Sequence, residues 1–168
     1  MVNLLNSAVY NPSVSGAISS IDISFDAKFL GGSTGTSQIA FRLAFEQGST
    51  IFVPLTVGVA QGPGNGQPGA AFQSFSFSAF TAADFVTIPT PGSGTPDFSN
   101  SGAPITFGYV TSDTVNLDNA FVMGGIDNWS VTVHPAANVP DPSNSLLLLS
   151  LGLLPFLLYS QRECQSVS

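Results

Sequence analysis

Charged residues are scarce in this sequence: they make up 8% of the chain, about a third of the usual share for a soluble domain. Three Lys and Arg stand against ten Asp and Glu, which gives a formal net charge of −7. A nucleic-acid-binding protein needs clustered cations to displace the counterions of phosphates. The composition therefore predicts no nucleic-acid partner. The 168 residues have room for one domain and a tail.

Cysteine and histidine occur once each, as Cys164 and His134. A single cysteine excludes a disulfide within the chain, so a free thiol is expected in the tail, with lipid attachment or a mixed disulfide as the alternative. A single histidine excludes a multi-histidine metal site within one chain and leaves any Ser/His/Asp triad dependent on His134. The sequence also lacks a GxSxG motif, a P-loop and a dinucleotide fingerprint. These absences predict that the protein is not an enzyme.

The carboxylates also give no pattern for catalysis. Asp22 and Asp26 share the polar face of an expected strand, which separates their Cα atoms by about 13 Å. A glycosidase needs its two carboxyl groups within about 5 to 9.5 Å of each other. We therefore expect surface carboxylates. Glu46 could approach them across a hairpin, but a salt bridge from Glu46 to Lys28 or Arg42 is the simpler expectation.

Helical periodicity is missing before residue 139, and alternation takes its place. Residues 21–29 and 39–45 alternate apolar and polar side chains, which predicts two half-buried strands. The turn-forming residues 31–37 between them predict that the two strands form an antiparallel hairpin. Five further strands are expected at residues 51–59, 72–80, 84–88, 105–110 and 124–133.

Two residues refine this pattern. Pro54 cannot donate to a ladder and predicts an edge strand or a bulge, and Ala79 is expected to face inward with Phe75 and Phe77. The fourteen Phe suit the core between two sheets. The predicted fold class is all-β: a jelly-roll-like antiparallel β-sandwich followed by a single C-terminal hydrophobic helix.

The end of the chain is organised differently. Residues 1–134 are expected to form the sandwich ectodomain, 135–145 a Pro-rich linker with a PDP motif, 146–159 a transmembrane helix and 160–168 a short polar tail. Fourteen helical residues extend about 21 Å against a hydrocarbon core of about 30 Å, so the span is marginal. A buried helix of the domain is the alternative, but Leu lies on all sides of this segment. The expected membrane anchors are Leu146, Leu149, Leu153 and Leu157.

This order resembles the sorting tail of the bacterial PEP-CTERM proteins. Val139, Pro140, Asp141 and Pro142 stand where that family has Val-Pro-Glu-Pro, the Leu block matches its helix, and Arg162 stands for its basic stop-transfer cluster. Two departures are Asp141 in place of Glu and a single Arg followed by Glu163. The resemblance covers about 25 residues.

The resemblance implies a route and a partner. An exosortase-type membrane protease or transpeptidase would recognise the motif, and the protein would be held in the bacterial cell envelope through its C-terminus and then released outside. The low-charge, Ser- and Thr-rich composition is also common in exported bacterial β-proteins. The first sixteen residues contain no cation and no apolar run of signal-peptide length, so the export signal is expected upstream of them.

The expected function is a structural or adhesive role associated with extracellular polysaccharide. The alternative is a lectin-like sugar-binding module in which Trp129 and Tyr109 form a platform for sugar rings. Core packing is the competing role for Trp129, because Val131 and Val133 share its face. No cofactor is expected except a structural calcium at Asp127, which could supply some of the six to eight oxygens that this ion takes.

Overall fold

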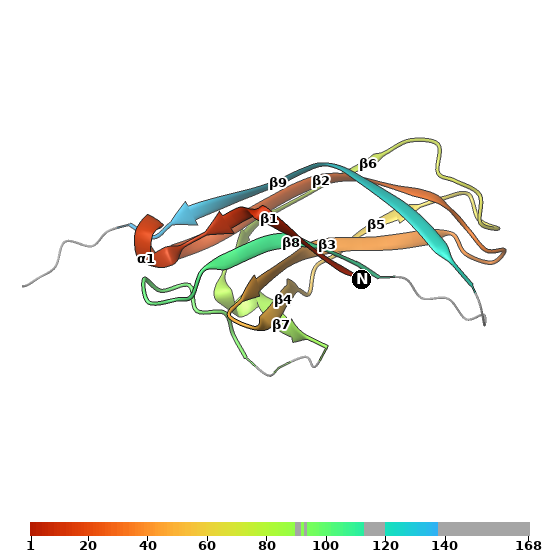
Figure 1. The fold of residues 1–168 in the computed structure, drawn as a ribbon. Helices are drawn as coiled ribbons and strands as arrows, with labels where there is room; N and C mark the ends of the chain where they lie inside the picture. The colour runs from red at the N-terminus through yellow and green to blue at the C-terminus, as the bar shows by residue number, and fades with distance from the viewer. Residues whose placement is uncertain (90–91, 93, 113–119, 138–168) are drawn as a thin grey trace, which may run out of the picture. The chain divides into compact units, whose positions relative to one another are not determined.

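The computed structural model describes residues 1–89, 92, 94–112 and 120–137, and these residues form two antiparallel β-sheets (Figure 1). The all-β class is thereby confirmed for this part of the chain. The strands are β1 (Val2–Tyr10), β2 (Ile18–Gly32), β3 (Gln38–Gln47), β4 (Thr50–Pro54), β5 (Gly58–Gln61), β6 (Gln73–Phe80), β7 (Phe85–Ile88), β8 (Ile105–Ser112) and β9 (Val122–Pro135); the two short helices are α1 (Pro12–Ser15) and the 3-10 helix η1 (Ala82–Asp84).

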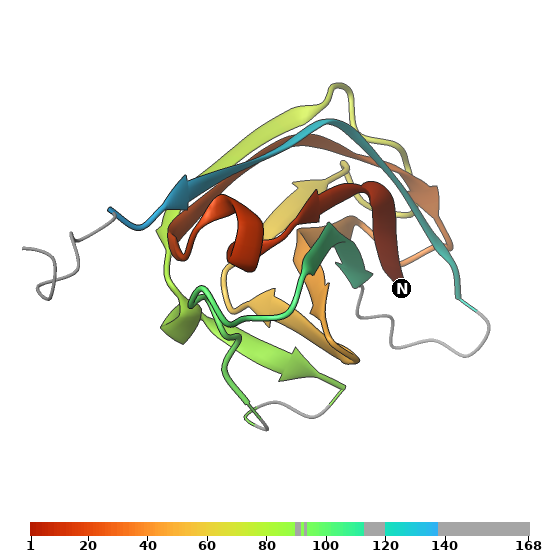
Figure 2. The ribbon, with the colours of Figure 1, turned by 60° about the vertical axis from the view of Figure 1, so that its left-hand side comes forward.

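The two sheets differ in size. The larger has six strands in the order β1-β8-β3-β4-β7, with β5 also paired to β3, and the smaller has three in the order β6-β2-β9. In Figure 2 the smaller sheet forms one layer above the strands of the larger one. The central strand β2 pairs with β9 from Ile18 to Gly32 and with β6 from Ile21 to Ala27.

The predicted hairpin of residues 21–29 and 39–45 is wrong, because β2 and β3 lie in opposite sheets. Both strands have the predicted alternation, but their apolar faces oppose each other across the core. The rings of Phe25 and Phe41, for example, have their centroids 6.4 Å apart. Alternation determines which face of a strand is buried and leaves open which strand lies beside it.

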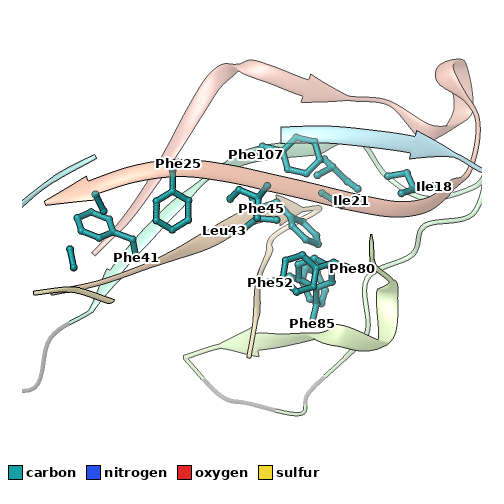
Figure 3. Packing of buried hydrophobic residues seen from close by; sticks show 14 of the residues in the cluster. Ile18, Ile21, Phe25, Phe41, Leu43, Phe45, Phe52, Phe80, Phe85 and Phe107 are labelled. Atoms are coloured by element: carbon teal, nitrogen blue, oxygen red, sulfur yellow. The ribbon is translucent and has the colours of Figure 1, made fainter. Parts of the chain in front are cut away.

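The core between the sheets is built largely of phenylalanine (Figure 3). Phe45 of β3 lies at its centre and is fully buried. Four other rings have centroids 4.9–6.0 Å from that of Phe45: Phe52, Phe85, Phe98 and Phe107. Phe98 comes from the loop between β7 and β8.

The strand expected at residues 51–59 is two strands. β4 and β5 pair with opposite ends of the same edge of β3, and the chain leaves that edge after Phe52. The expectation of an edge strand is wrong for β4 as a whole, because β4 lies between β3 and β7. Pro54 itself, the last residue of β4, pairs only with Phe85 of β7 and has no ladder partner on β3. The missing amide of proline is accommodated by ending the strand there.

Strand β1 was not predicted from the sequence, because its residues do not alternate regularly between apolar and polar. It pairs with β8, with a register irregularity between Leu4 and Val9 that interrupts the period of two. Gly108 of β8 permits the close approach, since a Cβ there would lie 2.0 Å from the Asn3 carbonyl oxygen. After β1, Asn11 caps α1 by accepting a hydrogen bond from the Ser13 amide at 3.2 Å.

Candidate functional site

The outward side of the smaller sheet is polar, in contrast to its apolar inner side. Along β2 the apolar residues point into the core and the polar ones between them point to solvent. The outward residues of β6 and β9 continue this surface. We call it the polar face; it consists of Asp22, Ser24, Asp26, Lys28, Ser74, Ser76, Asn128, Ser130, Thr132 and His134.

Asp22 links all three strands of the polar face. Its Oδ2 lies 2.8 Å from Nε2 of His134 on β9, and its Oδ1 accepts a 2.8 Å hydrogen bond from the Ala79 amide on β6. The Ala79 amide, followed by the hydrogen bond with His134, lowers the pKa of the Asp22 carboxyl below its ordinary value. A carboxylate stabilised by donors from two strands favours the register of both.

The Ala79 amide is available to Asp22 because β6 bulges there. The register shifts between the pairs Ile21–Phe80 and Ile23–Phe77, and Ala79 has a φ of 62°. The expectation that Ala79 faces inward is therefore wrong: Ala79 is exposed and Phe80 takes the next core position, with 8% of its surface exposed. A bulge inserts one extra residue into a strand. Residues beyond the bulge therefore point to the opposite side of the sheet from the one that uninterrupted alternation predicts.

Asp26 supports a second bulge, in β9. Its Oδ2 accepts a 2.6 Å hydrogen bond from Nδ2 of Asn128, whose φ is 50° and which lies where the β2–β9 register shifts. Hydrogen bonds from the Ser74 hydroxyl and then from Asn128 lower the pKa of the Asp26 carboxyl. Both carboxylates thus lie on the solvent side, as predicted, and each is held by a neighbouring strand.

An open depression of about 220 Å³ surrounds Asp26. Its polar groups are hydroxyls, one carboxylate and one amide, which together can donate to and accept from a ligand rich in hydroxyl groups. The lining residues are Ser24, Phe25, Asp26, Ser74, Phe75, Ser76 and Asn128.

His134 forms no triad in the described part of the chain. Its ring bonds to Asp22, and the Ser19 hydroxyl donates to the His134 backbone carbonyl, not to the ring. The contact of His134 with Asp22 is also the one contact at salt-bridge distance among the described residues. The predicted salt bridge from Glu46 to Lys28 or Arg42 is therefore wrong, and Glu46 cannot meet Asp22 because it lies on the other sheet.

The predicted sugar platform is not an exposed surface. Trp129 and Tyr109 are both half-buried and pack against the core, Trp129 from β9 and Tyr109 from β8. Val131 and Val133 share the Trp129 side, as the alternation predicted. Nε1 of Trp129 is buried without a hydrogen-bond partner among the residues described. These positions favour the core-packing role of Trp129.

Asp127 lies beside Asp26 across the ladder. Its Oδ1 accepts a 2.8 Å hydrogen bond from the Asn128 amide, and the Asp26 carboxylate already accepts a hydrogen bond from the Asn128 side chain. Calcium takes six to eight oxygens, and the described residues contain no group of three or more His, Cys, Asp or Glu placed to hold a metal ion. The arrangement gives the predicted calcium site no support.

The tail predictions fall on residues outside the described part of the chain. These are the sorting motif Val139, Pro140, Asp141 and Pro142, the anchors Leu146, Leu149, Leu153 and Leu157, the stop-transfer Arg162, and Cys164. Within residues 1–89, 92, 94–112 and 120–137, no helix has the length and apolarity needed to cross a membrane. Comparison with protein-family models, curated proteins and solved structures finds no match to this chain.

Proposed function

We propose that this chain is an exported, non-enzymatic protein of a bacterial cell envelope, delivered by a PEP-CTERM-like tail and acting in a structural or adhesive role at extracellular polysaccharide. In this proposal the sandwich is of jelly-roll type and residues 146–159 form a single membrane helix that an exosortase-type enzyme releases. The observation that supports this role is the polar face, which offers hydroxyl, amide and carboxylate groups and very few cations.

The polar face suits neutral, hydroxyl-rich polymers on chemical grounds. Its Ser and Thr hydroxyls can both donate and accept hydrogen bonds, as sugar hydroxyls do. Asp22 and Asp26 are held in place by neighbouring strands, so the surface is ordered before any ligand arrives. A surface ordered in advance loses less entropy when it binds.

The route is tested by the intact mass of the protein from membrane and medium fractions of the host, expressed from the full native locus. We expect a medium species that ends within residues 139–143. An intact tail on the extracellular protein in a strain with active exosortase would contradict the sorting proposal. Uncut chain held only in the membrane would make the tail a permanent anchor.

The second candidate function is a sugar-binding module with a defined site, and the depression around Asp26 favours it. The test is a glycan array with the released sandwich and with Asp26→Ala. Loss of binding with unchanged circular dichroism is the expected result. Ser130→Ala, on the same face but outside the lining of the depression, is the matched control; equal loss in both variants would argue against a defined site.

The predicted sugar platform of Trp129 and Tyr109 is tested on the same glycan array with Trp129→Ala and Tyr109→Ala. Since both side chains pack on the core, we expect these variants to lose stability in step with any loss of binding. Loss of binding in a fully folded Trp129→Ala protein would instead restore the platform and argue against the depression.

A further inference from the structure

Beyond Lys28 the outward side of the smaller sheet changes from polar to apolar. Leu30 follows Lys28 on the outward side of β2 and is 44% exposed, and Phe72, just before β6, is 47% exposed. Single exposed apolar side chains are common on proteins. These two lie together at one end of the polar face, and we call them its apolar end.

The Phe72 ring lies across the central strand of the smaller sheet. Its centroid is 6.0 Å from Nζ of Lys28 on β2, and its Cζ lies 3.7 Å from the point where a Cβ on Gly125 of β9 would be. Leu30 Cδ1 lies 3.3 Å from the same point. Lys28 and Gly125 are ladder partners. The ring therefore reaches from the β6 side of β2 to the β9 side, and the glycine lets the ring and Leu30 both approach the backbone of β9.

This ring adjoins the depression around Asp26. Ser74 lines the depression and is the ladder partner of Asp26, and Phe72 precedes Ser74 by two residues. Lys28 likewise follows Asp26 by two residues. Two residues of a strand extend about 6.6 Å, a distance that two linked sugar rings can span. Hydrogen-bonding groups and an aromatic ring thus lie next to each other on one surface.

The combination of these groups indicates the ligand. A sugar ring with equatorial hydroxyls has C–H groups on its faces, which pack on an aromatic ring, and hydroxyls around its rim. Nζ of Lys28 donates a 3.5 Å hydrogen bond to the Ala70 carbonyl, and an ammonium group with three donors can also donate to a sugar hydroxyl. Asp22 and Asp26 on the same face disfavour an acidic polymer.

We propose that Phe72 is the stacking platform of a sugar-binding site, on which one ring of a neutral, β-linked polysaccharide packs while the next ring enters the depression around Asp26. Leu30 extends the apolar contact, and Lys28 donates to hydroxyls at the rim of the stacked ring. This inference rests on the sugar-binding function proposed above and adds the residue that supplies its aromatic contact. Phe72 takes the role that the sequence predicted for Trp129 and Tyr109.

The test is isothermal titration calorimetry of the full chain with neutral hexasaccharides of β-linked glucose, mannose and xylose. The protein is kept in a polyoxyethylene detergent, which has no sugar head group to compete. We expect the wild type to bind at least one hexasaccharide. Phe72→Ala should raise its dissociation constant about tenfold, and Phe72→Tyr, which keeps an aromatic ring, should stay within about twofold of the wild type.

Phe121→Ala is the matched control and should bind as the wild type does. Phe121 is also an exposed phenylalanine, at 55%, but it precedes Val122, which pairs with Gly32 beyond the apolar end. The near-ultraviolet circular dichroism of Trp129 reports whether each variant keeps its core. Equal losses of binding in Phe72→Ala and Phe121→Ala would overturn the inference.

Other outcomes separate this inference from the function on which it rests. Binding that is lost in Asp26→Ala and unchanged in Phe72→Ala would overturn the platform and leave the sugar-binding function standing. A wild type that binds none of the three hexasaccharides would overturn the platform, and a blank glycan array would overturn the sugar-binding function with it. A wild-type dimer that dissociates in Phe72→Ala, measured by light scattering, would assign the ring to a contact between copies and overturn the platform as well.

Discussion

Gln47 shows how one buried polar side chain orders a long loop. Its Nε2 donates to the carbonyls of Asp97 at 2.7 Å and Ala103 at 3.0 Å, and its Oε1 accepts from the Asp97 amide at 2.8 Å. These bonds hold the loop that delivers Phe98 to the core. The side chain is 8% exposed, so water can replace little of this bonding.

We expect Gln47→Ala to lower the free energy of unfolding by about 1–3 kcal/mol, because it leaves buried backbone groups of the loop without partners. Urea denaturation measures the change. Gln38→Ala, at an exposed position of the same strand, should stay within about 0.5 kcal/mol of the wild type. Equal effects of the two substitutions would contradict the assigned role.

At the scale of elements, the alternation in the sequence predicted which side chains of β2, β3 and β9 are buried. It could not predict strand partners, because pairing depends on the whole chain, and so the hairpin of β2 with β3 was wrong. The bulges at Ala79 and Asn128 break the period locally and are set by bonds to Asp22 and Asp26 of another strand. The depression around Asp26 was missed for the same reason, although Asp26 itself was placed correctly on the solvent side.

The pairing of β1 with β8 depends on the absence of a side chain at Gly108. A methyl group at position 108 would meet the Asn3 carbonyl oxygen at 2.0 Å and Leu4 Cα at 2.8 Å, and both are backbone atoms. We expect Gly108→Ala to displace β1, lower the free energy of unfolding by about 1–3 kcal/mol and speed amide exchange in β1. Hydrogen exchange with mass spectrometry measures this.

Gly94→Ala is the control for that substitution, since the nearest atom to its added Cβ is Thr87 Cγ2 at 4.0 Å. Exchange in β1 should then match the wild type. The assigned role of Gly108 would be refuted by a Gly108→Ala protein whose β1 amides exchange as slowly as before.

At the scale of the molecule, four aspartates link stability to pH. Hydrogen bonds lower the pKa values of Asp22, Asp26, Asp84 and Asp97, with Ala79, Ser74, Thr81 and Ser99 as the leading donors. A carboxyl group whose pKa is lower in the folded state contributes stability above its unfolded pKa of about 3.9. That contribution to stability is lost as the pH falls through the pKa of the carboxyl group in the folded state.

We therefore expect the midpoint of thermal unfolding to fall as the pH is lowered from about 5 toward 2. Differential scanning calorimetry across this range measures it. A double variant, Asp22→Asn with Asp26→Asn, should show a shallower decline. The prediction would be contradicted by a midpoint that rises on acidification, or by a double variant whose midpoint declines as steeply with pH as that of the wild type. Either result would show that other groups cause the loss of stability at low pH.

The pairing of β2 with β9 also determines when the smaller sheet can be completed. Residues Ile18 and Pro135 are ladder partners. Almost the whole sandwich must therefore be synthesised before the central strand β2 can pair with β9. Contacts this distant along the chain form slowly. Only residues 136–145 separate that last strand from the Leu block. During directional synthesis or translocation, closure of the fold and arrival of the hydrophobic tail are therefore nearly simultaneous events.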